Sequence, residues 1–123
     1  MTVVAVVEDN ADNRLLLQAI LEGLYEVREY ETAEAALTAF RRDPPDLVLL
    51  DISLPGMDGV EILARMRADA ALRDLPVIAL TAHAMAGERE KYLGAGFDDY
   101  IAKPIVDERV LLAAIDRLTA GHR

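Results

Sequence analysis

Four short apolar runs and one alternating segment recur along the chain, and a stretch with helical spacing follows each of them. The five segments lie at residues 3–7, 25–30, 47–50, 76–80 and 100–102. Continuous runs of β-branched residues and leucine are typical of strands that are covered on both faces. The alternation from Tyr25 to Tyr30 suits a more exposed strand.

The segments between these strands place apolar residues on one side of a helix. The predicted helices cover residues 14–24, 32–40, 58–66, 84–96 and 107–118. The inward face of the first helix is expected to carry Leu15, Leu16, Leu17, Ile20, Leu21 and Leu24. Strands that alternate with helices over short connections predict an α/β domain, with a parallel sheet covered by helices on both faces.

Composition narrows the class of protein. With 123 residues the chain is expected to form one domain, residues 1–123. The absence of cysteine excludes disulfides, thiol catalysis and Cys-ligated zinc. A net charge of −9 without a basic patch argues against direct binding of nucleic acid. No long apolar segment or signal peptide is visible, so we expect a soluble, cytoplasmic domain that does not insert into membranes.

Acidic residues stand directly after two of the buried strands. Glu8 and Asp9 follow the first strand, and Asp51 follows the third. Because the carboxyl ends of parallel strands meet at one edge of a sheet, these carboxylates are expected within a few ångströms of one another. Clustered carboxylates repel each other unless a cation is present. Oxygen ligands of this kind suit Mg²⁺.

Three further side chains are expected at the same edge. Thr81 ends the fourth strand and offers a hydroxyl, and Lys103 follows the fifth strand with an ammonium that could pair with Asp51. Each has an ordinary alternative, since a lone threonine can simply end a strand and most lysines are solvated. Tyr100 is either a half-buried strand tyrosine or a ring that responds to the position of Thr81.

Four segments together resemble a known family. They are VEDN at 7–10, DISLPGMDG at 51–59, LTA at 80–82 and KP at 103–104. In this order and spacing they resemble the receiver domain of two-component response regulators, across essentially the whole chain. The resemblance implies a flavodoxin-like fold, a doubly wound five-stranded sheet of order 2-1-3-4-5. It extends to single-domain regulators of chemotaxis and cell-cycle type and to receivers of hybrid histidine kinases.

The resemblance also implies a phosphoacceptor and a metal site. Asp51 would accept a phosphoryl group from a phosphohistidine. Asp9, Asp51 and the backbone carbonyl of Ser53 would bind Mg²⁺ directly, and Glu8 would act mainly through water. The chain would then catalyse only its own phosphorylation and dephosphorylation, as a signalling switch rather than an enzyme.

The remaining implied roles concern the switch. Thr81 and Lys103 would hold phosphoryl oxygens, and Tyr100 would change rotamer with Thr81. The output surface would be the face built by the fourth helix, the fifth strand and the fifth helix, about residues 84–118. The implied partners are a sensor histidine kinase or histidine phosphotransfer protein and a downstream protein, with no DNA-binding output domain in this chain.

Alternatives and departures from the family pattern remain. An aspartyl-phosphate hydrolase commonly has a second carboxylate two residues after the nucleophile, where this chain has Ser53; sustained turnover of a phosphate ester would favour it. A phosphate-independent interaction domain would show weak Mg²⁺ binding and no response to a phosphoryl donor. Val106 stands where the family often caps the last helix, so Asp107 is expected to take over that role.

Overall fold

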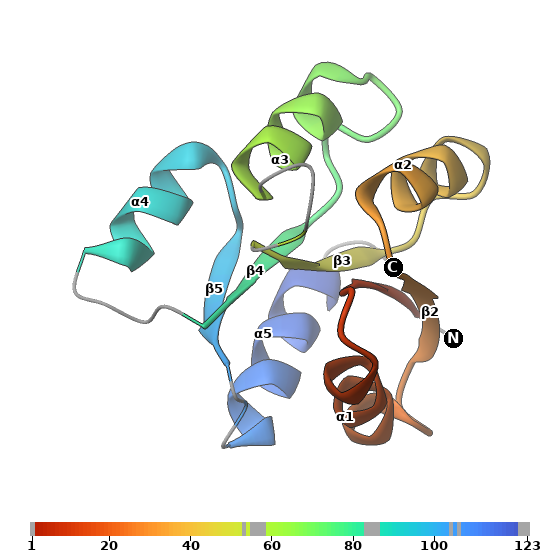
Figure 1. The fold of residues 1–123 in the computed structure, drawn as a ribbon, viewed down its shortest axis with the longest axis vertical. Helices are drawn as coiled ribbons and strands as arrows, with labels where there is room; N and C mark the ends of the chain where they lie inside the picture. The colour runs from red at the N-terminus through yellow and green to blue at the C-terminus, as the bar shows by residue number, and fades with distance from the viewer. Residues whose placement is uncertain are drawn as a thin grey trace.

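The computed structural model describes residues 2–52, 54, 59–82, 87–103, 105 and 107–120, and these form alternating strands and helices (Figure 1). In chain order they are β1 (Val3–Val7), α1 (Ala11–Leu21), β2 (Glu26–Tyr30), α2 (Ala33–Arg42), β3 (Leu47–Asp51), α3 (Gly59–Ala68), β4 (Val77–Thr81), α4 (Glu88–Ala95), β5 (Asp99–Ala102) and α5 (Glu108–Thr119). The predicted α/β class is confirmed.

The five strands form one parallel sheet in the order β2-β1-β3-β4-β5, as the family resemblance implies. The register aligns the carboxyl ends of the strands. Val7 pairs with Leu50, and Thr81 pairs with Ala102. The side chains that follow β1, β3, β4 and β5 therefore meet at one edge of the sheet.

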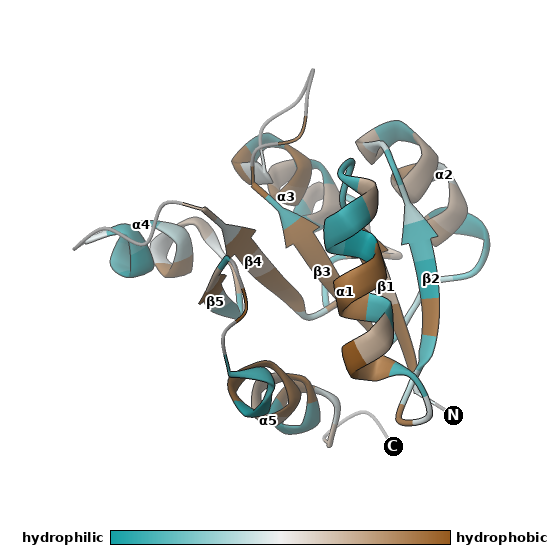
Figure 2. Cartoon of the chain, turned by 60° about the horizontal axis from the view of Figure 1, so that its bottom comes forward, coloured by the Kyte–Doolittle hydropathy of each residue, from teal (hydrophilic) through white to brown (hydrophobic). Residues whose placement is uncertain are grey.

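Helices cover both faces of the sheet, α2, α3 and α4 on one side and α1 and α5 on the other (Figure 1). Residues along each buried strand alternate between two cores, so Val4 and Val6 face one and Ala5 and Val7 face the other. The central strands are brown with apolar residues in Figure 2, whereas the edge strand β2 carries polar positions. Within the described residues, no helix is long and apolar enough to cross a membrane.

Local signals begin two of the helices as predicted. The Thr32 side chain accepts a hydrogen bond from the backbone N–H of Ala35 at 3.2 Å. Asp107 caps α5 by accepting from the N–H of Arg109 at 3.0 Å, which confirms that it caps in place of Val106. Asp58, where the third helix was predicted to begin, lies outside the described residues. Each cap satisfies a backbone donor that has no partner inside its helix.

Two predicted helices need correction. The first ends at Leu21, and three of its predicted inward residues are exposed: Leu15 by 69%, Leu16 by 42% and Leu24 by 54%. The fourth was predicted from about residue 84 but begins at Glu88, because Gly87 has a φ of 90° that a right-handed helix does not allow. Residues 83–86 lie outside the described part of the chain.

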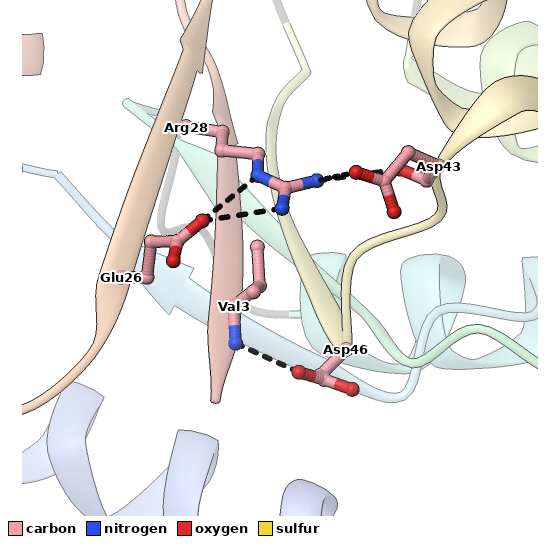
Figure 3. A network of polar contacts seen from close by, with 5 residues as sticks. All are labelled: Val3, Glu26, Arg28, Asp43 and Asp46. Atoms are coloured by element: carbon pink, nitrogen blue, oxygen red, sulfur yellow. Dashed lines mark hydrogen bonds and ion pairs between the residues drawn. The ribbon is translucent and has the colours of Figure 1, made fainter. Parts of the chain in front are cut away.

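Polar contacts fasten the amino-terminal edge of the sheet, opposite the expected site (Figure 3). The backbone N–H of Val3 donates to the Asp46 carboxylate at 2.7 Å, which ties the start of β1 to the start of β3. Arg28 donates to Glu26 at 3.1 Å and to Asp43 at 3.0 Å. Opposite charges thus face each other along this edge.

Arg67, in the last turn of α3, adds a second fastening at the amino-terminal edge. Its guanidinium donates to the backbone carbonyls of Arg73 at 3.0 Å, Leu75 at 2.6 Å and Gly96 at 3.0 Å. It also donates to Asp98 at 3.0 Å, and Asp98 accepts from the N–H of Val77 at 2.8 Å. One side chain therefore joins α3 to the segments that lead into β4 and β5.

Candidate functional site

The carboxylates predicted from the strand ends do lie together. Glu8, Asp9 and Asp51 each offer a ligand oxygen, and these oxygens lie within 4.8 Å of one another. Glu8 has no exposed surface and Asp51 is 3% exposed, whereas Asp9 is exposed. The cluster therefore has two buried carboxylates and one that faces solvent.

Lys103 supplies the positive charge of the cluster. Its Nζ lies 3.3 Å from Asp51 Oδ1, as predicted, and 2.9 Å from Glu8 Oε1. The shorter contact with Glu8 was not predicted, because the sequence shows only that the two residues share an edge. Burial disfavours the charged form, but the hydrogen bond to Glu8 and the charge of Asp51 outweigh it and raise the pKa of Lys103. The ammonium therefore stays charged.

Within the cluster, the surroundings of Glu8 shift its pKa. Burial raises the pKa of Glu8 above its ordinary value, and the adjacent Asp51 raises it further, against the opposing effect of Lys103. Arg14, which sequence reasoning did not single out, donates to the backbone carbonyl of Glu8 at 2.8 Å. One ammonium thus faces two buried carboxylates, so the cluster is short of positive charge.

Thr81 and Tyr100 lie on two adjacent strands. Thr81 is fully buried at the end of β4, and its backbone carbonyl accepts from the N–H of Lys103 at 2.6 Å. Tyr100 pairs in register with Ala79, two residues before Thr81, so both side chains project from the same face of the sheet. The Tyr100 ring is half-buried. Ser53, His83 and Pro104 lie outside the described residues.

Tyr92 on α4 is a neighbour of the site that the sequence did not reveal. Its ring stacks on Tyr100 with a centroid separation of 5.6 Å and an interplanar angle of 17°. The contact joins residues from a helix and a strand, and no local spacing announces it. Burial and, to a smaller extent, the charge of Glu88 raise the pKa of Tyr100.

Comparison with known families assigns the chain to one of them. The pattern of the response regulator receiver domain matches residues 4–116. The chain therefore belongs to the response regulator receiver domain family, the receiver domains of two-component signalling systems.

The chain is similar in sequence to two kinds of known proteins. It is 45% identical over 111 residues to the signal transduction histidine-protein kinase BarA of Shigella flexneri, covering 89% of this chain and 12% of that protein. It is 41% identical over 103 residues to the polar-differentiation response regulator DivK of Brucella ovis, covering 83% of this chain and 84% of that protein. The chain thus spans only a small part of the kinases and most of the single-domain regulator.

Solved structures show the same fold. The receiver domain of sensor histidine kinase PA1611 from Pseudomonas aeruginosa, with a magnesium ion coordinated in its active site cleft, matches with a TM-score of 0.86 and 35% identity over 97% of this chain and 98% of that one. A response regulator from Chloroflexus aurantiacus matches with a TM-score of 0.89 and 30% identity, over 97% and 98% of the two chains.

Proposed function

We propose that this domain is a phosphorylation-activated switch in which Asp51 accepts a phosphoryl group from a phosphohistidine. The observation that carries the proposal is the cluster itself, in which Asp51 lies beside two further carboxylates and within 3.3 Å of the Lys103 ammonium. Buried like charges are costly to keep without a function. A site that receives a metal ion and a phosphoryl group explains why they are held together.

The donor set fits Mg²⁺. Glu8, Asp9 and Asp51 offer oxygen ligands, and Mg²⁺ prefers a few carboxylates with water and phosphate completing its shell. We assign the metal to Asp9, Asp51 and the backbone carbonyl of Ser53, with Glu8 acting through water. When bound, Mg²⁺ would neutralise negative charge on the carboxylates and the incoming phosphoryl group.

The transfer step needs a nucleophile and stabilisation of charge. An oxygen of Asp51 forms the new bond to phosphorus while the phosphorus–nitrogen bond of the phosphohistidine breaks, and the electron pair leaves on the imidazole nitrogen. The Lys103 ammonium then exchanges carboxylate contacts for a phosphoryl oxygen. The Thr81 hydroxyl donates to a second phosphoryl oxygen.

Signal output follows from the added charge. Movement of Thr81 toward the phosphoryl group would make room for Tyr100, and this would bias an existing equilibrium between two states. We place the output surface on α4, β5 and α5, where Arg89, Tyr100, Ile105 and Val110 line a shared groove. The domain would act in the cytoplasm, alone or within a longer chain, and its partners would be a sensor histidine kinase or histidine phosphotransfer protein and a downstream protein.

Incubation with acetyl phosphate tests the proposal, with intact mass as the readout. We expect one phosphate adduct in the presence of Mg²⁺ and none in a chelator. Asp51→Asn should remain folded and carry no adduct. Adduct formation by Asp51→Asn, or undiminished transfer in the chelator, would contradict the proposed chemistry.

Lys103→Ala separates metal binding from switching. We expect this variant to retain Mg²⁺ binding, because the lysine is not a metal ligand, and to lose the conformational response. Mg²⁺ titration and binding to the phosphotransfer partner measure the two properties. A normal response from Lys103→Ala would exclude the role assigned to this lysine.

A further inference from the structure

We infer that Tyr92 is the residue through which a change at Tyr100 reaches α4, so that the whole helix is repositioned rather than only the Tyr100 side chain. The inference rests on the switch proposed above and adds a residue to it. Two independent observations carry it: the stack between the two rings, and the way in which α4 is anchored to the rest of the domain.

The stack is an extended contact between aromatic faces. The rings of Tyr92 and Tyr100 lie 5.6 Å apart between centroids and 17° from parallel. Aromatic pairs favour such offset arrangements, and the contact is lost when one ring turns away. A rotamer change of Tyr100 therefore cannot leave the surroundings of Tyr92 unchanged.

The packing of α4 explains why this contact matters for the position of the helix. Tyr92 is the one buried residue of α4, whose eight residues are all described, and it is 6% exposed. The α2 helix, in contrast, buries four residues. Helices in proteins are held mainly by packing of their apolar face. Tyr92 is therefore the buried apolar anchor of α4, and the ion pair of 3.4 Å between Arg89 and Asp99 adds a polar contact with β5.

Two rings surround Tyr92, and only one of them belongs to the switch. Phe97 packs edge-on against it, with centroids 5.9 Å apart and planes at 84°. Phe97 lies in the turn between α4 and β5, whereas Tyr100 lies on β5 itself. When Tyr100 turns away, Tyr92 keeps its contact with Phe97, which follows α4 in the chain. It loses its contact with Tyr100 on β5. The ion pair of 3.4 Å between Arg89 of α4 and Asp99 of β5 remains, and α4 can shift relative to β5 as far as this ion pair allows.

The amino-terminal end of α4 also interacts with Tyr100. Glu88 stands one helical turn before Tyr92, at the i, i+4 spacing that places both residues on one side of the helix. Burial raises the pKa of Tyr100, and the negative charge of Glu88 raises it further. This effect of charge agrees with the stack on Tyr92, which places Tyr100 beside α4.

The test compares activation in the wild type and three variants by NMR. Beryllofluoride with Mg²⁺ serves as the phosphoryl mimic, and fluorotyrosine labelling follows the chain's four tyrosines. In the wild type, the signals of Tyr92 and Tyr100 and the amide signals of α4 should change together. In Tyr92→Leu, Tyr100 should still respond while the amide changes in α4 fall severalfold. Tyr92→Phe, which keeps the ring, should behave as the wild type.

Phe97→Leu is the matched control, because it removes an aromatic ring from the same cluster without touching the stack. It should leave transmission to α4 intact. An equal loss in Phe97→Leu, or full α4 changes in Tyr92→Leu, would overturn the inference. If Tyr92→Leu fails to fold, the wild type decides alone, since an unmoved Tyr92 signal beside a moved Tyr100 signal would also overturn it.

Intact mass after treatment with acetyl phosphate keeps the two proposals distinguishable. An Asp51 adduct in the wild type without any change in α4 would overturn the role of Tyr92 and leave the phosphoacceptor standing. A wild type that takes up neither phosphate nor its mimic would overturn the phosphoryl switch, and with it the inference that rests on it.

Discussion

The two edges of the sheet differ in how deeply their charged groups are buried, since the ion pairs of Arg28 are exposed and the carboxylates beside Lys103 are buried. At the amino-terminal edge, Arg28 faces two carboxylates (Figure 3). Arg67 donates to backbone carbonyls and to Asp98 at the same edge. At the carboxyl-terminal edge, the buried carboxylates of Glu8 and Asp51 share one ammonium and repel each other.

Because of this difference, we expect the amino-terminal edge to serve mainly stability and the carboxyl-terminal edge to serve mainly phosphorylation. Paired groups at one edge satisfy backbone donors and acceptors and hold loops in place, which favours the folded state. Unbalanced carboxylates at the other edge favour a ligand that brings positive charge. Substitutions at the amino-terminal edge should therefore lower stability and leave phosphorylation unchanged. Substitutions at the carboxyl-terminal edge should impair phosphorylation without lowering stability.

The largest loss of stability is expected from Arg67→Ala. The side chain donates to four acceptors on two segments, and its removal leaves three backbone carbonyls, that of Leu75 part-buried, without this donor. We expect a loss of about 2–3 kcal/mol in the free energy of unfolding, measured with urea.

The neighbouring arginine on α3 provides the control for this substitution. Arg65→Ala removes an exposed side chain from the same helix and should cost less than about 0.5 kcal/mol. Both variants should form the phosphate adduct at the rate of the wild type. A slowed adduct in Arg67→Ala would break the separation between the two edges.

Gly59→Ala should affect both properties, because it lies next to the site. A Cβ at Gly59 would come within 3.0 Å of the Ile52 Cα, and Ile52 directly follows Asp51. We expect a loss of about 1–2 kcal/mol and slower adduct formation. Gly94→Ala, with nothing within 4 Å of the new Cβ, should instead stabilise the domain by roughly 0.5–1 kcal/mol. Equal effects of the two substitutions would refute the steric explanation.

Asp46→Ala should have a smaller effect. It removes the acceptor of the Val3 N–H, a bond of 2.7 Å that joins β1 to the start of β3. We expect a loss of about 1 kcal/mol. Asp43→Ala breaks only an exposed ion pair with Arg28 and should change stability by less than about 0.5 kcal/mol. Urea unfolding of both variants measures the difference, and a larger loss for Asp43→Ala would contradict the ranking.

The smallest effect concerns the ionisation of Tyr100. Burial and the charge of Glu88 raise the pKa of Tyr100, so its contribution to stability is complete below the ordinary value of 10.0 and is lost as the pH rises through the higher folded value. Glu88→Gln should lower that pKa while the effect of burial remains. Glu90→Gln, farther along α4, is the control. An ultraviolet titration in which both variants match the wild type would refute the contact with Glu88.

Most of the fold could be predicted because the strands are apolar runs separated by short helices. The order of the strands came from the family resemblance, since periodicity alone does not fix it. The exposed Leu15, Leu16 and Leu24 were mispredicted because apolar spacing does not show which part of a wide apolar face the sheet covers. The fourth helix begins later than predicted because Gly87 has a positive φ, which the spacing of apolar residues does not show.

The site was predictable to the extent that strand ends determine it. Glu8, Asp9, Asp51 and Lys103 were expected together because parallel strands end at a common edge. The closer pairing of Lys103 with Glu8 depends on side-chain reach across the sheet. The stack of Tyr92 on Tyr100 joins a helix and a strand through space. Neither this stack nor the Lys103–Glu8 pairing could be inferred from spacing along the chain.

The free energy of unfolding of the wild type and of Asp51→Asn, each in a chelator and in Mg²⁺, tests the central claim most directly. Because the substitution removes one of two repelling carboxylates, the variant should be at least as stable as the wild type in the chelator. Mg²⁺ should then stabilise the wild type and stabilise the variant far less. A variant clearly less stable in the chelator, with equal gains from Mg²⁺ for both proteins, would contradict the account.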